Sequence, residues 1–206
     1  MTRTAIRQEE LLRDCAVDVE RIDAEARRLT AGLSEAQLRW NPPDGGWSIA
    51  QVFAHLVQAN ASYFDRMREA IAAGPRREAD ATWRPTLFGG LLYRSLEPSN
   101  RRGAPSPKIW RPASHPPADT LDNFLAGQAT LAGLIRDAAD TDLVRTRLSS
   151  PVSRLVRINL GDAIRVLVVH DWRHLGQVER VLARPGFPAV AASAADSAER
   201  EGAGTQ

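Results

Sequence analysis

The sequence of 206 residues contains a single cysteine, Cys15, and a single lysine, Lys108. One cysteine excludes an internal disulfide and a cysteine-rich zinc site. Because lysine is so scarce, the pI near 9.2 reflects arginine, and the formal net charge at pH 7 is only +2. So small a net charge gives no electrostatic reason to expect nucleic acid or a membrane surface as a partner.

Long apolar runs are also absent from the sequence. No stretch approaches the roughly 18–20 residues that a membrane-spanning helix needs, and the first residues, "MTRTAIRQEELL", lack the apolar core of a signal peptide. The 43% hydrophobic and 25% charged fractions are typical of a soluble globular protein. We therefore expect a cytoplasmic protein with one domain over residues 1–188, followed by a small, polar and disordered tail over residues 189–206.

Helical periodicity dominates what the sequence does contain. Apolar residues recur at three- and four-residue steps in four segments, at about residues 5–31, 48–73, 118–139 and 160–183. Ser48 forms a capping box with Gln51, and Asn159 can cap the last segment. No convincing strand pattern is present, and the weakly alternating residues 152–158 are expected to lead into the last helix in an extended form. The sequence therefore predicts an all-α protein.

The lengths of the connections predict how the four helices are arranged. The link of roughly 44 residues over 74–117 is long enough to cross a bundle from end to end. We therefore expect an up-down-down-up four-helix bundle with a long crossover between the second and third helices. Because so long a link is unusual without structure of its own, "TLFGGLLYRSLE" is expected to form a short helix within it.

Candidate chemistry gathers around "HDWRHLGQ", residues 170–177. His170 and His174 are one helical turn apart, so both imidazoles project from one face. A shared divalent metal would hold two such neutral rings together. His55, in the second helix, is the natural third ligand, and three histidines with an open position describe a catalytic type of site. His115 lies in a proline-rich loop and is left out of this site.

Other interpretations of the same residues remain open. A histidine near an apolar helix face is more often a hydrogen-bonded core residue than a metal ligand. "HDWRH" is similar to the His-Glu-x-x-His helix of zinc peptidases, but its acid is Asp171, one methylene shorter. The "HD" doublet is similar to HD-domain phosphohydrolases, which need a further aspartate. Asp171 is more typical of a surface residue or a supporting partner than of a base, and neither it nor Trp172 obviously faces the metal.

Two motifs resemble the DinB/YfiT-like superfamily of metalloenzymes. They are "LSEAQLRWNPPDGGWSIAQVFAHL" at residues 33–56, with its Trp-Ser cap and helix histidine, and "LGDAIRVLVVHDWRHLGQVERVL" at residues 160–182. The link "LFGGLLYRSLEP…RRGAPSPKIWRP" also resembles the crossover of one DinB-like branch. The resemblance covers about residues 5–185. It implies the up-down-down-up bundle and a divalent metal, often nickel or zinc, held by His55, His170 and His174.

The resemblance also implies what such a site does. Some members are transferases or isomerases that use a low-molecular-weight thiol, and a metal-dependent hydrolase is the related possibility. Gln177, one turn beyond His174, could bind the metal's water, orient an imidazole or cap backbone. Cys15 lies amid an apolar stripe, so a thiol would arrive as a cosubstrate. The alternative is a stress-associated, non-catalytic bundle; a small-molecule substrate and a homodimer are the partners we expect.

The crossover adds a cluster of positive charge. Residues 75 to 112 include eight basic and three acidic residues, so the net charge of this segment is +5. The cluster could attract a carboxylate, or its members could pair with acids elsewhere, which we favour. The basic residues are Arg76, Arg77, Arg84, Arg94, Arg101, Arg102, Lys108 and Arg111. Four aromatic residues are expected to pin this segment to the bundle or to line a pocket mouth: Trp83, Phe88, Tyr93 and Trp110.

Overall fold

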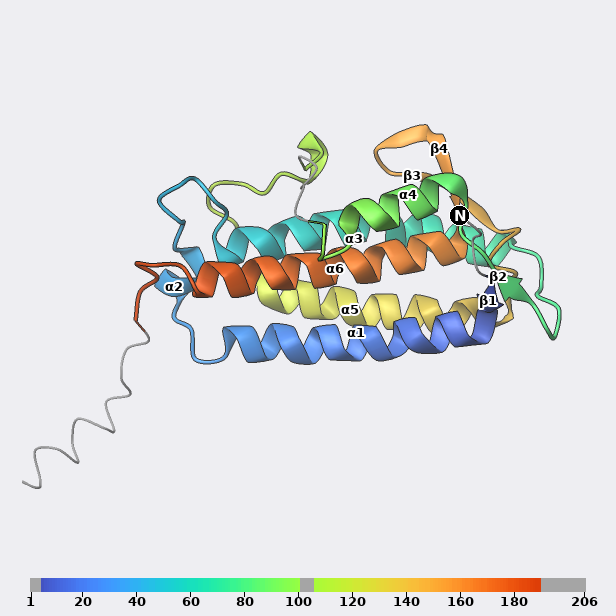
Figure 1. Cartoon of the computed structure of the whole chain (residues 1–206), viewed down its shortest axis with the longest axis horizontal. Coiled ribbons are helices and arrows are strands. Elements are labelled where there is room, and N and C mark those ends of the chain that lie inside the picture. Colours follow the sequence, from blue (N-terminus) through green and yellow to red (C-terminus); the bar gives the residue numbers. More distant parts are fainter. Residues whose placement is uncertain (1–4, 101–105, 190–206) are drawn as a thin grey trace, which may run out of the picture.

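Four long helices form the body of the computed structural model, which describes residues 5–100 and 106–189 (Figure 1). They are α1 (Gln8–Thr30), α3 (Ile49–Ala73), α5 (Thr120–Asp137) and α6 (Leu160–Leu182). Their bounds lie close to the four predicted segments. The colours of Figure 1 show α1 and α6 running one way along the bundle and α3 and α5 the other way. The tail predicted from residue 189 onward lies outside the described residues, apart from its first residue.

The core is built from the apolar stripe of each long helix. Each helix packs against two neighbours, in the order α1, α6, α3, α5 and back to α1. Ile22, Leu56, Leu131 and Ile164, one from each helix, are fully buried between them. Burying such a side chain contributes roughly 1.5–3 kcal/mol. None of the helices in the described ranges has both the length and the apolar character needed to cross a bilayer.

Two small antiparallel sheets correct the expectation of an all-α chain. β1 (Ile6–Arg7) pairs with β2 (Thr82–Trp83), and β3 (Arg147–Ser150) forms a hairpin with β4 (Ser153–Asn159). The expected extended lead into α6 is therefore one arm of a hairpin. Only two residues separate its strands, and polar residues interrupt their alternation, so the local pattern is weak. The protein is mostly helical, with two short sheets at one end.

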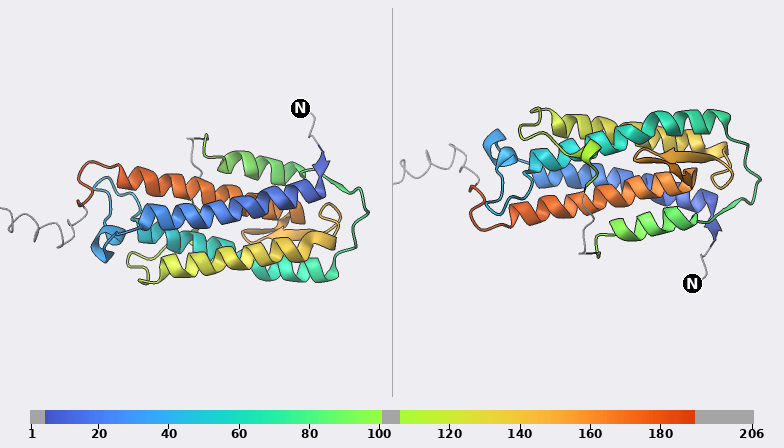
Figure 2. Two further views of the ribbon diagram at one scale, coloured as in Figure 1. Left: turned by 90° about the horizontal axis from the view of Figure 1, so that it is seen from below. Right: turned by 90° about the horizontal axis from the view of Figure 1, so that it is seen from above.

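The crossover carries structure of its own. It holds β2, then α4 (Leu87–Leu96), which confirms the short helix predicted there, and a 3-10 turn at Lys108–Trp110. Figure 2 shows the chain passing around one end of the bundle before α4 lies alongside α6. A further short helix, α2 (Glu35–Arg39), was not predicted, although Ser34 and Gln37 form a capping box at its start.

The N-terminus of α6 anchors the crossover. Asn159 caps α6 by accepting a hydrogen bond from the backbone of Asp162 at 2.8 Å, and the same oxygen accepts from Trp83 Nε1 at 3.0 Å. Asp162 Oδ2 accepts from the Thr86 backbone at 3.0 Å and from its hydroxyl at 2.7 Å. The two residues that satisfy the first turn of α6 thus also hold the crossover. Gly161, between them, leaves room for the Trp83 indole.

Replacing this glycine tests the anchor. A methyl group at Gly161 would overlap the Trp83 indole, so we expect Gly161→Ala to lower the free energy of unfolding by about 1–3 kcal/mol. Gly133→Ala is the matched control, because nothing lies within 4 Å of its added methyl; alanine there should raise stability by roughly 0.5–1 kcal/mol. Urea unfolding followed by circular dichroism measures both. Equal stability of the two variants would contradict the anchor.

Candidate metal centre

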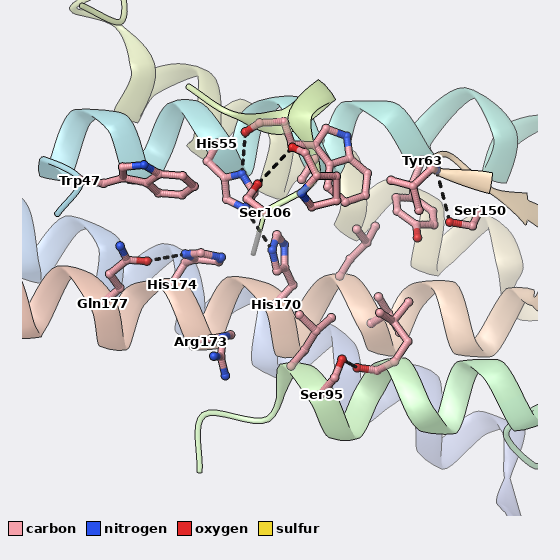
Figure 3. Close-up of a pocket in the computed structure, with 18 of the residues that line it drawn as sticks. Trp47, His55, Tyr63, Ser95, Ser106, Ser150, His170, Arg173, His174 and Gln177 are labelled. Carbon is pink, nitrogen blue, oxygen red and sulfur yellow. Dashed lines mark hydrogen bonds between the residues drawn. The ribbon is translucent and has the colours of Figure 1, made fainter. Parts of the chain in front are cut away.

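Three histidines converge between α3 and α6 (Figure 3). His55 projects from α3, and His170 and His174 project from α6, one turn apart. The Nε2 atoms of His55 and His170 are 3.2 Å apart, and one ring nitrogen of each residue lies within 4.8 Å of the others. The structure therefore brings together the three histidines singled out in the sequence. His115 is exposed in the loop before α5 and takes no part.

Hydrogen bonds at the opposite ring nitrogens orient two of the imidazoles. His55 Nδ1 donates to the carbonyl oxygen of Trp110, and His174 Nδ1 donates to Gln177 Oε1, both at 2.8 Å. Each bond places the proton on Nδ1 and leaves Nε2 with a free lone pair. Of the roles considered for Gln177, the geometry shows the contact that orients an imidazole.

Burial keeps these rings neutral. It is the largest cause that lowers the pKa of His55, and it lowers that of His170 far below the usual value. The pKa of His174 falls to about 3, because of burial and then the neighbouring His55. The crowding of the rings reinforces the effect, since each charge would repel the next. At neutral pH all three residues are therefore in the form that binds metals.

Trp47 is a site residue that was not predicted from the sequence. It immediately precedes Ser48, the N-cap of α3, whose capping box with Gln51 fixes the chain there. The Trp47 ring stacks on His174 with centroids 6.3 Å apart and planes at 17°, and it lies 5.1 Å from the ring of His55. This indole covers one side of the histidine cluster. Its position before the cap was the only sequence signal for that role.

A cavity of about 540 Å³ opens from the histidines between α3 and α6. α4 and residues 106–110 of the crossover supply another wall, and the β3–β4 hairpin supplies Ser150 and Val152. Arg173 ties α4 to α6, because its Nη1 donates to the carbonyl oxygens of Glu97 at 3.1 Å and Asn100 at 2.9 Å. The three histidines therefore face a space large enough for a small molecule.

Comparison with known proteins agrees with this architecture. The sequence model of the DinB superfamily matches residues 19–178. The chain belongs to the DinB superfamily. Over 88% of this chain and 90% of the other, the fold is similar to that of YfiT from Bacillus subtilis, with a TM-score of 0.56 and 17% identity. That protein is described as "a probable metal-dependent hydrolase with an unusual four-helix bundle topology". No curated protein matches the chain by sequence.

Asp171 is buried in this DinB-superfamily protein and does not occupy the surface position considered for it. It is fully buried and accepts hydrogen bonds from Asn60 Nδ2 at 3.0 Å and Gln128 Nε2 at 2.8 Å. Burial raises its pKa to about 7. Its carboxylate links α6 to α3 and α5, and in the described structure it is not part of the histidine cluster. Neither a zinc-peptidase base nor an HD-type ligand fits this position.

The basic crossover residues do not gather at the cavity of this DinB-superfamily protein. Arg76 pairs with Asp140 at 3.2 Å and Arg77 with Glu9 at 2.9 Å, as the favoured interpretation predicted for part of the cluster. Arg101 and Arg102 lie outside the described residues. Among those described, the one arginine or lysine lining the cavity is Arg173, which belongs to α6.

The crossover aromatics divide between the two expected roles. Trp83 is buried and pins the crossover to α6, whereas Trp110 lines the cavity. Tyr93 stacks on the Arg165 guanidinium at 3.7 Å, and Phe88 is half exposed. The segment is therefore held by two aromatic contacts and also contributes a wall of the site.

Cys15 offers a test of whether the chain supplies its own thiolate. Its thiol is buried in α1, and burial raises its pKa to about 12. That leaves a thiolate fraction at pH 8 roughly 1000-fold smaller than for an ordinary thiol. We expect Ellman's reagent to react with the folded protein only very slowly, and to react at once in denaturant. Reaction of the native protein at the rate of a free thiol would contradict this position for Cys15.

Proposed function

We propose that this chain is a metal-dependent enzyme in which His55, His170 and His174 hold a divalent transition metal. The observation that carries the proposal is the convergence of three neutral imidazoles in the wall of an open cavity. Three nitrogen ligands with a position left for water or substrate are typical of catalytic sites, whereas structural sites are closed by a fourth protein ligand. In the described structure no other histidine, cysteine or carboxylate joins the cluster.

The donor set fits a metal of this kind. His55 and His170 face each other with Nε2 atoms at 3.2 Å. Two lone pairs at that separation repel, so a proton or a cation must lie between them. The bonds from Nδ1 of His55 to Trp110 and of His174 to Gln177 leave Nε2 as the ligand atom. When bound, a divalent metal supplies Lewis acidity and lowers the pKa of a water or thiol in the open position.

Two reaction types suit this site: hydrolysis, and transfer of a low-molecular-weight thiol to an electrophile. The description of YfiT supports the first. The second needs a thiol from outside, because Cys15 is buried in another part of the molecule. In both reactions the protein binds the substrate in the cavity, and the apolar walls of the cavity exclude bulk water. The cavity beside the histidines favours an enzyme over a non-catalytic, stress-associated bundle.

Several finer expectations belong to this proposal. Nickel or zinc is the metal we expect, since imidazole nitrogen suits both ions. The up-down-down-up order is supported by the helix directions in Figure 1. Cytoplasmic location, a small-molecule substrate and a homodimer also remain predictions.

Metal content tests the ligands directly. We expect the purified protein to contain about one equivalent of metal per chain, and we expect His55→Ala and His170→Ala to lose nearly all of it, because two ligands rarely hold a transition metal. Elemental analysis after dialysis gives the stoichiometry. His115→Ala is the matched control, since it removes the one histidine outside the cluster and should keep the metal. Unchanged metal in either cluster variant would refute the assignment.

Activity separates the two reaction types. The metal-loaded protein should hydrolyse an activated ester, or add glutathione, bacillithiol or mycothiol to an electrophile. In His170→Ala the rate should fall to that of the reagents in buffer, while His115→Ala should match the wild type. Release of nitrophenol and loss of free thiol are the two measurements. No turnover in either assay by a protein carrying its full metal would favour the non-catalytic alternative.

A further inference from the structure

The cavity extends from the histidines toward the hairpin, and Trp47 and Gln177 line it on the other side of the histidines (Figure 3). His55, Ala59 and Tyr63 are four residues apart on α3, and all three line it. Because a helix rises 1.5 Å per residue, the cavity continues for roughly 12 Å along α3 from His55 to Tyr63. Figure 3 shows Tyr63 and Ser150 together, well separated from the histidines along α3. The cavity is thus a channel that leads from the candidate metal centre toward the hairpin.

Apolar side chains form the middle of this channel. Ala59 lines it from α3, and Val166 and Leu167 line it from α6. Leu92 and Leu96 of α4 also line it. Such walls gain free energy only when they cover apolar groups of a ligand.

The distribution of charge along the channel also favours an apolar ligand. None of the described residues lining it is an aspartate or glutamate. Its one guanidinium, that of Arg173, is engaged with the carbonyl oxygens of Glu97 and Asn100 and extends away from the histidines in Figure 3. A charged group beyond the metal centre would therefore lose its hydration without gaining a counterion. The side chains of Tyr63 and Ser150 place hydroxyl groups at the far end.

We infer that the substrate carries an aliphatic chain on the side of its reacting centre that faces the hairpin, and that the channel between His55 and Tyr63 binds this chain and limits its length. The inference rests on the proposed function, since it assigns the substrate class of the same site. The reacting group lies at the histidines. The uncharged chain lies against Ala59 and Leu167, and its end reaches the hydroxyls of Tyr63 and Ser150.

Straight-chain alcohols test the channel without any turnover. n-Alkanols from butanol to dodecanol are titrated into the full-length protein, with and without metal. Trp47 and Trp110 line the cavity, so intrinsic fluorescence reports binding. Affinity should rise by about fourfold per added methylene, until the chain spans roughly 12 Å, and should then level off between octanol and decanol. Affinity that is independent of chain length, or that keeps rising through dodecanol, would overturn the inference.

Matched variants locate the binding site. Ala59→Leu fills the channel midway, so the affinity should level off at a shorter alkanol. Ala61→Leu adds the same side chain on the exposed face of α3 and should leave the series unchanged. Val152→Asp, at a half-exposed position of the hairpin, should weaken binding of the longest alkanols only. If Ala59→Leu does not fold, Val152→Asp still tests the inference. A series in which Val152→Asp or folded Ala59→Leu behaves as the wild type does would overturn the assignment.

The outcomes also separate this inference from the proposed function. If the protein shows the chain-length limit but no turnover, only the proposed enzymatic function is refuted. If the protein is an active enzyme but binds butanol and decanol equally well, only the inference of an aliphatic channel is refuted.

Discussion

The site depends on one constraint: three imidazoles must stay neutral and share the space between two packed helices. Burial meets the first half of this requirement, because it lowers the pKa of each ring. Orientation meets the second half, because Trp110 and Gln177 occupy Nδ1 of two rings and leave their Nε2 atoms toward the centre. An interior that disfavours imidazolium therefore keeps the three imidazoles in the form that binds metals, and apolar packing of the bundle stabilises that arrangement.

The crossover completes the site from outside the bundle. It is anchored at the N-terminus of α6 through Trp83 and Thr86, and it returns to α3 where the carbonyl oxygen of Trp110 accepts a hydrogen bond from His55. Gln51 strengthens that return by donating to the carbonyl oxygen of Ala113 at 3.2 Å. Cap residues of both helices thus serve twice: they satisfy the first helical turn, and they position the segment that walls the cavity.

The sequence predicted the parts of this design that follow local rules. Four helices followed from periodicity, and the histidine triad followed from a one-turn spacing together with a histidine on another apolar helix. The sequence named Trp110 as a possible lining residue, but its hydrogen bond with His55 could not be predicted, because a backbone carbonyl makes it and every residue has one. The surface alternative for Asp171 was wrong, because its partners, Asn60 and Gln128, lie on other helices and leave no local signal of burial. The hairpin was missed for another reason: its strands are short, and polar residues interrupt their alternation.

The hairpin has an evolutionary consequence. It lies between α5 and α6 in the chain, and it reaches the cavity with Ser150 and Val152, whereas the histidines come from α3 and α6. One wall of the cavity is thus encoded in a different stretch of the gene from the histidines. An insertion or deletion in the turn between β3 and β4 would therefore change this wall without altering the two helices that carry the imidazoles.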